Sequence, residues 1–209
     1  YADGLKYITD RTKMKVNIED LLSDAYADER RKHIGKTALT PMPGEPNKGG
    51  TVYLATADEE GNMVSYIQSN YMGFGSGLVV PDTGIALQNR GHSFSLDPLH
   101  HNALEPGKKT YHTIIPGFLT KAGKPMGPFG VMGGFMQPQG HVQVVMNTVD
   151  FMLNPQATLD APRWRWVKEK AIEVERNFPF HIAEELQRRG HLVSTALGFS
   201  EFGRGQIIW

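Results

Sequence analysis

The order of apolar and polar residues divides the chain at residue 51. Apolar residues recur at helical spacing between Asn17 and Gly35, which predicts one helix over Ile18–His33 with Asn17 as its N-cap and Gly35 as its stop. Residues 41–50 hold three prolines and three glycines and show no periodicity, so they predict an exposed loop. Exposed loops of this kind are where proteolytic cuts concentrate.

A β-hairpin is predicted directly after this loop. Residues 51–57 and 63–69 are rich in β-forming side chains and flank the turn sequence Asp-Glu-Glu-Gly-Asn. Because a short turn fixes the pairing of two antiparallel strands, Thr51 should lie opposite a residue between Ser69 and Tyr71. We therefore expect the hydroxyl groups of Thr51 and Ser69 to lie close together at the open end of the hairpin.

The rest of the chain mixes short strands with helices. Because the strands mostly precede the helices, we expect an α+β architecture rather than a doubly wound sheet. The pattern predicts strands at 78–80, 111–115, 118–120 and 205–209, and helices over His141–Leu153, after Asn154-Pro155, and over Phe180–Arg189 with Gly190 as the stop.

Charge and composition exclude several classes of function. The chain has 22 Lys and Arg and 22 Asp and Glu, so its formal net charge is zero and it lacks the basic field expected of a nucleic-acid-binding protein. No apolar run approaches the roughly 20 residues that span a bilayer. Cysteine is absent, which removes disulfides and thiolate metal sites and leaves Ser, Thr or Lys as nucleophiles.

Both ends of the sequence are abrupt. The chain begins at Tyr1 without a methionine and stops within the strand-like run Gly205–Trp209. We therefore expect a fragment of a longer protein, whose localisation these residues do not indicate.

The junction of Gly50 and Thr51 has the chemistry that self-cleavage requires. A threonine hydroxyl can attack the preceding carbonyl, which a glycine leaves sterically open. Cleavage would place a free α-amino group on Thr51, and with a pKa near 8 that amine can act as the base for its own hydroxyl. The alternative is an ordinary threonine that opens a strand, and the local sequence alone favours it.

A second candidate is the pair Gly133-Gly134, which follows an apolar, strand-like segment. Adjacent glycines allow backbone N–H groups to turn toward an oxyanion and stabilise it. A tight turn before the next helix is the alternative, and the pair considered alone favours that turn.

The remaining motifs favour structural roles. Three imidazoles could bind a metal, but no Asp or Glu lies among them at a helical ligand spacing, so surface histidines are favoured. The run Arg163–Trp166 favours packing of alternating strand faces over base stacking, and Gly73–Gly77 predicts a turn or a close backbone approach rather than a dinucleotide site. The histidines considered are His92, His100, His101, His112 and His141.

Taken together, these segments resemble the γ-glutamyltransferase family, in particular its acylase-like branch. Residues 1–50 resemble the C-terminal end of the large subunit, and 51–209 resemble the small catalytic subunit, with its C-terminus incomplete. The matching segments are Thr51 with Asp58, Gly61-Asn62 and Val64-Ser65; Phe74–Gly77 with Pro81 and Thr83–Ile85; Pro106–Lys108 with Ile115-Pro116; Gly133-Gly134; and Asp160–Arg163.

The resemblance implies a fold, a reaction and roles for particular residues. The fold would be a four-layer αββα sandwich of the N-terminal-nucleophile (Ntn) hydrolase type. The chain would cut itself between Gly50 and Thr51, and Thr51 would then attack an amide through an acyl-enzyme. Gly133 and Gly134 would form the oxyanion hole. Ser69 takes the place of a second family threonine that hydrogen-bonds the nucleophile, in agreement with the hairpin register.

The sequence departs from the family pattern where the substrate would bind. The family holds the γ-glutamyl α-amino and α-carboxylate groups with Asn, an acid or amide, Asp and a pair of serines. This chain has Tyr71, Arg90, Ser93 and the pair His112-Thr113 at those places. Loss of the Asp removes the partner of an α-ammonium group, and an Arg favours an anion. We therefore expect a substrate with a carboxylate but without a required amino group, such as a glutaryl amide.

These observations predict a self-processing amidohydrolase or acyltransferase that needs no cofactor and no metal. Its partners would be a small amide substrate and the remainder of the large subunit; a homo-oligomer is left open, and no nucleic acid is expected. Two alternatives remain at this point. One is an inactive or immature fragment with the same fold, and the other is a metal-dependent hydrolase that uses the histidines.

Overall fold

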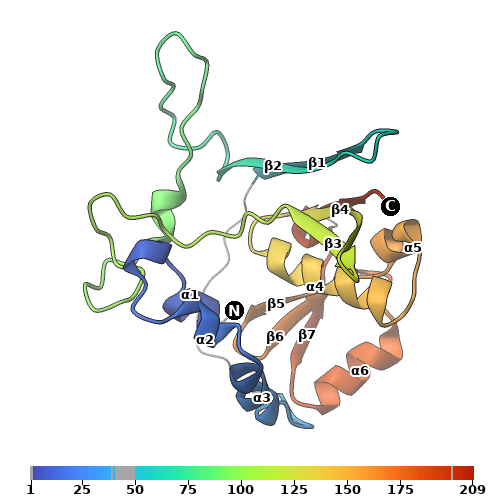
Figure 1. Cartoon of the computed structure of the whole chain (residues 1–209). Coiled ribbons are helices and arrows are strands. Elements are labelled where there is room, and N and C mark those ends of the chain that lie inside the picture. Colours follow the sequence, from blue (N-terminus) through green and yellow to red (C-terminus); the bar gives the residue numbers. More distant parts are fainter. Residues whose placement is uncertain (1, 39, 41–49, 199) are drawn as a thin grey trace.

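The computed structural model describes residues 2–38, 40, 50–198 and 200–209 and shows a mixture of helices and antiparallel and parallel strands (Figure 1). The predicted loop at 41–50 lies almost wholly outside these residues. Three sheets are present in the described part of the chain, with the strand orders β1-β2, β3-β4-β8 and β5-β6-β7.

The N-terminal segment contains short helices instead of one long one. These are α1 (Ala2–Tyr7), the 3-10 helix η1 (Arg11–Lys13), α2 (Ile18–Leu21) and α3 (Asp24–Lys32). Asn17 caps α2 as predicted, since its side chain accepts a hydrogen bond from the N–H of Glu19. The prediction of a single helix to His33 was wrong, because the Ser23 side chain accepts the N–H of Tyr26 at 3.1 Å and starts a new helix.

The predicted hairpin is confirmed. Strand β1 (Gly50–Ala57) pairs with β2 (Met63–Tyr71), and Gly50 lies opposite Tyr71 while Val52 lies opposite Gln68. The register shifts between these two pairs, so one residue of β1 faces two residues of β2, as in a β-bulge. Thr51 therefore lies opposite the stretch between Gln68 and Tyr71, as the sequence predicted.

The hairpin packs on a second sheet built around β4 (Lys124–Met132), as Figure 1 shows. Strands β3 (Gly117–Lys121) and β8 (Arg204–Ile207) flank β4 and confirm the predicted strands near 118–120 and 205–209. Tyr53 of the hairpin is buried on β4, where Gly130 leaves room for its ring. Strand β4 was anticipated only as a strand-like segment before the glycine pair, without bounds, because four glycines and prolines lie within it.

Helix α4 (Met136–Val149) follows β4 and packs against it. It begins five residues before the predicted start at His141, since Gly133 and Gly134 accept the N–H groups of Met136 and Gln137 and close the first turn earlier. Phe129, Val131 and Val144 form a buried apolar core between β4 and α4.

A third sheet and the helix that connects two of its strands lie below α4 in Figure 1. The short helix predicted after Asn154-Pro155 is α5 (Pro155–Asp160), with Asn154 as its N-cap, and α6 (Phe180–Arg188) ends before Gly190, whose φ is +95°. Strand β5 confirms the strand interpretation of the Trp-containing run. The third sheet comprises β5 (Trp164–Lys168), β6 (Ala171–Val174) and β7 (Leu192–Thr195). Strands β6 and β7 are parallel and connected through α6, and this parallel pairing was not predicted.

Residues 72–116 form a long connection that contains only the 3-10 helix η2 (Arg90–Ser93). The strands predicted at 78–80 and 111–115 are wrong: the first makes a single isolated bridge, from Val79 to Ala86, and the second forms no ladder. The close approach predicted for Gly73–Gly77 is confirmed. At Gly75 the φ is +78°, and a Cβ would overlap the carbonyl oxygen of Leu87.

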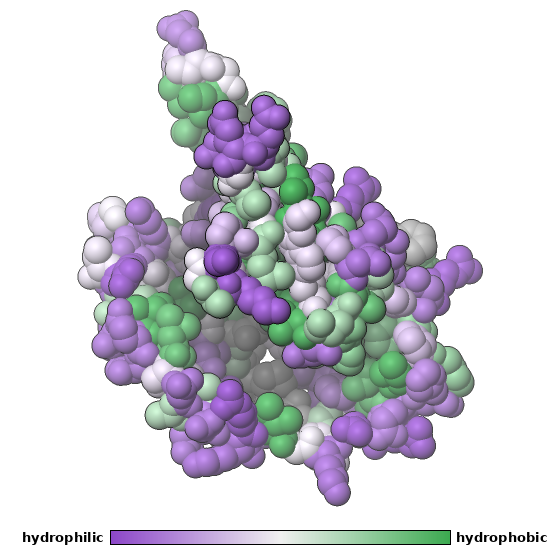
Figure 2. Space-filling view, turned by 45° about the vertical axis from the view of Figure 1, so that its right-hand side comes forward, coloured by the Kyte–Doolittle hydropathy of each residue, from purple (hydrophilic) through white to green (hydrophobic). Residues whose placement is uncertain are grey.

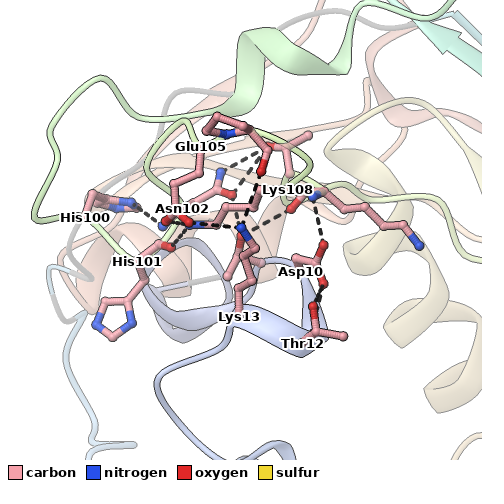
Figure 3. Close-up of polar contacts among 12 residues, drawn as sticks. Asp10, Thr12, Lys13, His100, His101, Asn102, Glu105 and Lys108 are labelled. Carbon is pink, nitrogen blue, oxygen red and sulfur yellow. Dashed lines mark hydrogen bonds and ion pairs between the residues drawn. The ribbon is translucent and has the colours of Figure 1, made fainter.

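Polar contacts attach the N-terminal segment to this connection (Figure 3). Asp10 donates its N–H to the carbonyl of Lys109 and accepts the N–H of Lys109 on its carboxylate, both at 3.0 Å. Thr9 donates to the buried Asn102 at 2.9 Å, and Lys13 lies 3.3 Å from a Glu105 oxygen. Residues about a hundred positions apart are thereby held together on one side of the molecule.

Large apolar side chains also remain at the surface. Figure 2 shows hydrophobic patches between hydrophilic ones, including along the projecting part of the 72–116 connection. Val142, Val149 and Met152 are exposed on and directly after α4. None of the helices among the described residues has the length and hydropathy needed to cross a membrane.

Candidate active site

Thr51 and Ser69 lie in direct contact at the open end of the hairpin. The Thr51 hydroxyl donates to Ser69 Oγ at 3.1 Å, and both residues are partly buried. Ser69 Oγ also accepts the backbone N–H of Tyr71 at 3.0 Å. Because a backbone N–H can only donate, it fixes the position of the Ser69 oxygen, and Ser69 in turn orients the Thr51 hydroxyl. The proximity predicted from the hairpin register is therefore confirmed.

A third group reaches Thr51 from helix α4. Gln137 is fully buried, and its Nε2 lies 3.5 Å from Thr51 Oγ1, at the outer limit of a hydrogen bond. Gln137 was not among the site residues predicted from the sequence. Its only signal was a glutamine three residues after the glycine pair, on a helix that buries several other polar side chains, and such a position is not specific to chemistry.

The pair Gly133-Gly134 forms the turn between β4 and α4. Their φ values are +128° and +59°, and a Cβ on Gly133 would come within 2.9 Å of Gly203 Cα. Both carbonyls accept hydrogen bonds from the first turn of α4. The buried Thr113 hydroxyl also donates to the Gly134 carbonyl, at 2.9 Å. Since the carbonyls are held in this way, the backbone of the turn is fixed.

Gln137 connects the glycine turn with Thr51. Its N–H donates to the Gly134 carbonyl at 3.1 Å, while its side chain extends to Thr51. The start of α4 therefore brings the turn and the threonine into one site. Contacts of β1 and β2 with β4 hold the other side of this site.

Arg90 and Tyr71 both contact Ser69. Arg90 is 9% exposed, donates to the Ser69 carbonyl at 3.3 Å and lies 5.4 Å from the centre of the Tyr71 ring. Burial lowers the pKa of Arg90, although an arginine stays charged at neutral pH. Tyr71 has a φ of +76°, which is rare for a non-glycine residue and turns the chain sharply at the end of β2. In the part of the chain that the structure describes, no carboxylate pairs with Arg90.

The other predicted substrate residues are less closely grouped. Loss of solvent around its ring and, second, the charge of Arg90 lower the pKa of His112, although much of the residue is exposed. The Ser93 carbonyl accepts a hydrogen bond from Asn102 at 2.8 Å. His92 lies 6.4 Å from the Tyr71 ring centre. Thr113 lies at the glycine turn instead of beside Arg90, so the His112-Thr113 pair is divided between two places.

The histidines do not converge. Among the described residues, no group of three or more His, Asp or Glu side chains is arranged to hold a metal ion. His141 is buried beside Phe129, with its Nδ1 2.6 Å from the Gln137 carbonyl. His101 lies against the Tyr7 ring, in the contact between the N-terminal segment and the 72–116 connection.

Comparison with known proteins finds a family match over the whole sequence. The family described as gamma-glutamyltranspeptidase matches residues 1–209. The chain is 39% identical over 200 residues to the glutathione hydrolase-like YwrD proenzyme of Bacillus subtilis and 34% identical over 200 residues to the oxamate amidohydrolase proenzyme of Klebsiella pneumoniae. These alignments cover 93% of this chain.

A solved structure shows the same fold. The crystal structure of cephalosporin acylase from Bacillus halodurans superposes with a TM-score of 0.92 and is 68% identical, covering all of this chain. This chain spans 38% of that protein and 38% of each of the two proenzymes.

Proposed function

This chain belongs to the γ-glutamyltranspeptidase family, and on that premise we propose that it carries the catalytic centre of a self-processing amidohydrolase with Thr51 as the nucleophile. The observation that carries the proposal is the 3.1 Å contact of Thr51 Oγ1 with Ser69 Oγ, at the first residues of a strand that follows a glycine. Several relatives are named proenzymes, as self-processing would require.

Maturation begins at the bond between Gly50 and Thr51. Thr51 Oγ attacks the Gly50 carbonyl, the C–N bond breaks, and the nitrogen takes up the hydroxyl proton. The resulting ester is hydrolysed by water, which leaves a carboxylate on Gly50 and returns the hydroxyl to Thr51. The product residue has both a nucleophile and a free α-amine, whose ordinary pKa is near 8.

Turnover then uses the same atoms on an external amide. The amine accepts the Thr51 hydroxyl proton as the oxygen attacks the substrate carbonyl, and N–H groups of the Gly133-Gly134 turn stabilise the oxyanion. The substrate amine leaves with a proton, and water or an amine acceptor releases the acyl group. Support for the glycine role comes from the fixed carbonyls of the turn, which leave N–H groups as its remaining polar atoms.

For the substrate we propose an amide whose acyl chain ends in a carboxylate, such as a glutaryl amide or a γ-glutamyl amide. The buried Arg90 beside Tyr71 supplies a positive charge, and His112 lies near enough for Arg90 to lower its pKa. Ser93 follows in the same 3-10 helix as Arg90. Thr113 would act through the glycine turn. The relatives named glutathione hydrolase, oxamate amidohydrolase and acylase are all named for amide hydrolysis or acyl chemistry.

The arrangement of the whole protein is part of the same proposal. Residues 1–50 would be the end of the large subunit and 51–209 the small catalytic subunit, which the remainder of the large subunit completes to a four-layer αββα sandwich. The exposed apolar face of α4, which includes Val142 and Val149, supports a further layer there. The chain spans 38% of the length of its proenzyme relatives, and the rest of such a protein could supply this layer.

The test is the intact mass of the full-length protein. Wild-type protein should separate into two pieces with the boundary between Gly50 and Thr51, and Thr51→Ala should remain one chain without activity. An active wild-type protein that stays in one piece would contradict the proposal. The same assay addresses the two alternatives, which the comparisons do not support. An inactive or immature fragment would show no turnover, whether or not it splits, and a metal hydrolase would stay in one piece and lose activity with a chelator.

A further inference from the structure

In the uncut chain, only the nitrogen of the buried Gln137 side-chain amide has a hydrogen-bond partner among the described residues. Its Nε2 faces Thr51 Oγ1 at 3.5 Å, while its Oε1 is buried and has no hydrogen-bond partner among the described residues. Because the Thr51 hydroxyl donates its proton to Ser69, it can only accept from Gln137, so the amide nitrogen is the atom that faces it.

An unpaired acceptor in a buried position has a cost. Leaving such a group without a donor costs on the order of 1–3 kcal/mol, and buried polar atoms in native proteins usually have a partner. The backbone of Gln137 is held at both ends, since its N–H bonds the Gly134 carbonyl and its own carbonyl lies 2.6 Å from His141 Nδ1. Because the side chain between these points is fully buried, it has little free space in which to turn away from Thr51.

We propose that Gln137 Oε1 accepts a hydrogen bond from the α-amino group that self-cleavage creates on Thr51. In the uncut chain the Thr51 nitrogen is an amide of strand β1. Cleavage converts it into an amine with additional donors, next to the hydroxyl that Nε2 already faces. The two ends of one planar amide would then hold the amine and the hydroxyl of the same threonine. This inference rests on the proposed function, because it requires Thr51 to become the N-terminus.

Such a contact has a definite electrostatic consequence. A carbonyl oxygen stabilises an ammonium more strongly than a neutral amine, so the contact raises the pKa of the Thr51 α-amine. Arg90, whose side chain bonds the Ser69 carbonyl, acts in the opposite direction through its positive charge. Gln137 thus makes the Thr51 α-amine a stronger base and raises the pH above which this amine is unprotonated.

The titratable groups on the elements around Thr51 must be included in this balance. Strands β1, β2, β4 and β8 and helices α4 and η2 contain no Asp or Glu. Their titratable groups are Tyr53 on β1, Tyr66 and Tyr71 on β2, Arg90 and His92 on η2, Lys124 on β4, His141 on α4 and the exposed Arg204 on β8, and His112 lies in the 72–116 connection. Arg90 is charged throughout the neutral range, and both His112 and His141 have pKa values below the ordinary one because of burial. His112 and His141 are therefore neutral where the amine titrates.

The experiment measures kcat/KM against pH in the full-length protein for wild type, Gln137→Met and Gln137→Glu. The acid limb reports the pKa of the base in the free enzyme. We expect it to move to lower pH in Gln137→Met, by about half a unit to one unit, since the acceptor is lost. In Gln137→Glu a carboxylate replaces the carbonyl, and the limb should move to higher pH by about one unit or more.

Gln143→Met is the matched control. Gln143 is a buried glutamine on the same helix, but its amide bonds the backbone of Trp164 and not Thr51. It should leave the acid limb in place even if the protein becomes less stable. Opposite shifts in the two Gln137 variants with no shift in the control would support the proposal, since a purely structural role predicts no such pattern.

Two results would overturn the inference, and they can be told apart. If wild-type protein splits at Thr51 but both Gln137 variants keep the wild-type acid limb, the role of Gln137 is wrong and the proposed function stands. If wild-type protein does not split, both fail together. Should one Gln137 variant not fold, the other decides alone: an acid limb that stays at the wild-type position would contradict an acceptor at this position.

Discussion

At the scale of single residues, the Thr51 hydroxyl is oriented by a short chain of donors. The Tyr71 N–H holds Ser69 Oγ, and Ser69 Oγ receives the hydrogen of Thr51. An error of about 1 Å in the position of a reacting atom can cost on the order of a hundredfold in rate. The serine is therefore expected to matter although it takes no part in bond making.

Replacing Ser69 tests this orientation. In Ser69→Ala the acceptor is lost, so kcat should fall about a hundredfold and self-cleavage should slow in the same direction. Ser69→Thr keeps the hydroxyl and should stay within about tenfold of wild type, with the two variants compared by steady-state kinetics and by intact mass over time. Equal losses in both variants would indicate that packing, and not the hydroxyl, is the important property.

Replacing Arg90 tests the acyl-chain carboxylate. A charge-assisted hydrogen bond contributes about 1.5–3 kcal/mol, so Arg90→Gln should raise KM for a glutaryl anilide by roughly tenfold to a hundredfold. Arg90→Lys keeps the charge but loses the forked geometry, so its KM should lie between those of wild type and Arg90→Gln. The wild-type enzyme should not require the α-amino group, which a comparison with the γ-glutamyl anilide measures. A strong wild-type preference for the γ-glutamyl compound would contradict the assignment.

Only part of this site could be predicted from the sequence. The proximity of Thr51 and Ser69 follows from local rules, because the turn and the alternation of the strands fix the register. Gln137 is 86 positions from Thr51, and their contact depends on how α4 packs against the hairpin. The positive φ of Tyr71 likewise depends on its surroundings, since no property of a tyrosine favours it.

At the scale of elements, glycine is required where backbones meet. Gly203 lies between η3 (Ser200–Phe202) and β8 with a φ of +68°, and a Cβ there would overlap the Met132 carbonyl oxygen of β4. Gly77 has a similar φ of +78° but open space around it. Both glycines have a left-handed backbone conformation that would strain any residue with a Cβ, and they differ in the space around them.

Alanine at these two positions separates strain from contact. Gly77→Ala should cost about 1 kcal/mol through the left-handed conformation alone. Gly203→Ala should cost more, about 2–4 kcal/mol, because β8 must also move away from β4. Thermal or denaturant unfolding of the full-length protein measures both. Equal losses would show that the approach of β8 to β4 is more tolerant than its geometry indicates.

The elements that could be predicted are those with local signals. The hairpin has its turn sequence, α5 has the Asn154 cap, and α6 has a terminal glycine. Strand β4 has no such signal: Pro125 and Pro128 would argue against a strand, but both precede the stretch 129–132 that β4 shares with β8. The parallel pairing of β6 with β7 depends on contacts that no short pattern contains.

At the scale of the whole molecule, the N-terminal segment depends on the Asp10 carboxylate. The N–H of Lys109 and, next, the hydroxyl and N–H of Thr12 lower the pKa of Asp10. A carboxyl group with a lowered folded-state pKa stabilises the protein above its unfolded pKa, about 3.9, and that contribution is lost as the pH falls through the folded value.

Asp10→Ala should therefore lower the Tm near pH 7, and the difference from wild type should disappear as the pH falls below about 4. Melting curves of the full-length protein across this range measure it. Glu59→Ala, in the exposed hairpin turn, is the control and should leave the Tm unchanged. A difference that persists at the acid end would mean that the Asp10 side chain acts by packing instead of charge.

The same contact of Asp10 with Lys109 has a consequence once the chain is cut. Before cleavage, residues 9–13 and 102–109 belong to one molecule, and their encounter is governed by an effective concentration that the connecting chain sets. The proposed cleavage between Gly50 and Thr51 would remove that connection, so the same hydrogen bonds would then help to hold two separate polypeptides together against dilution. The mature enzyme would then obey mass action, and its activity at low protein concentration would report the dissociation constant of its own two halves.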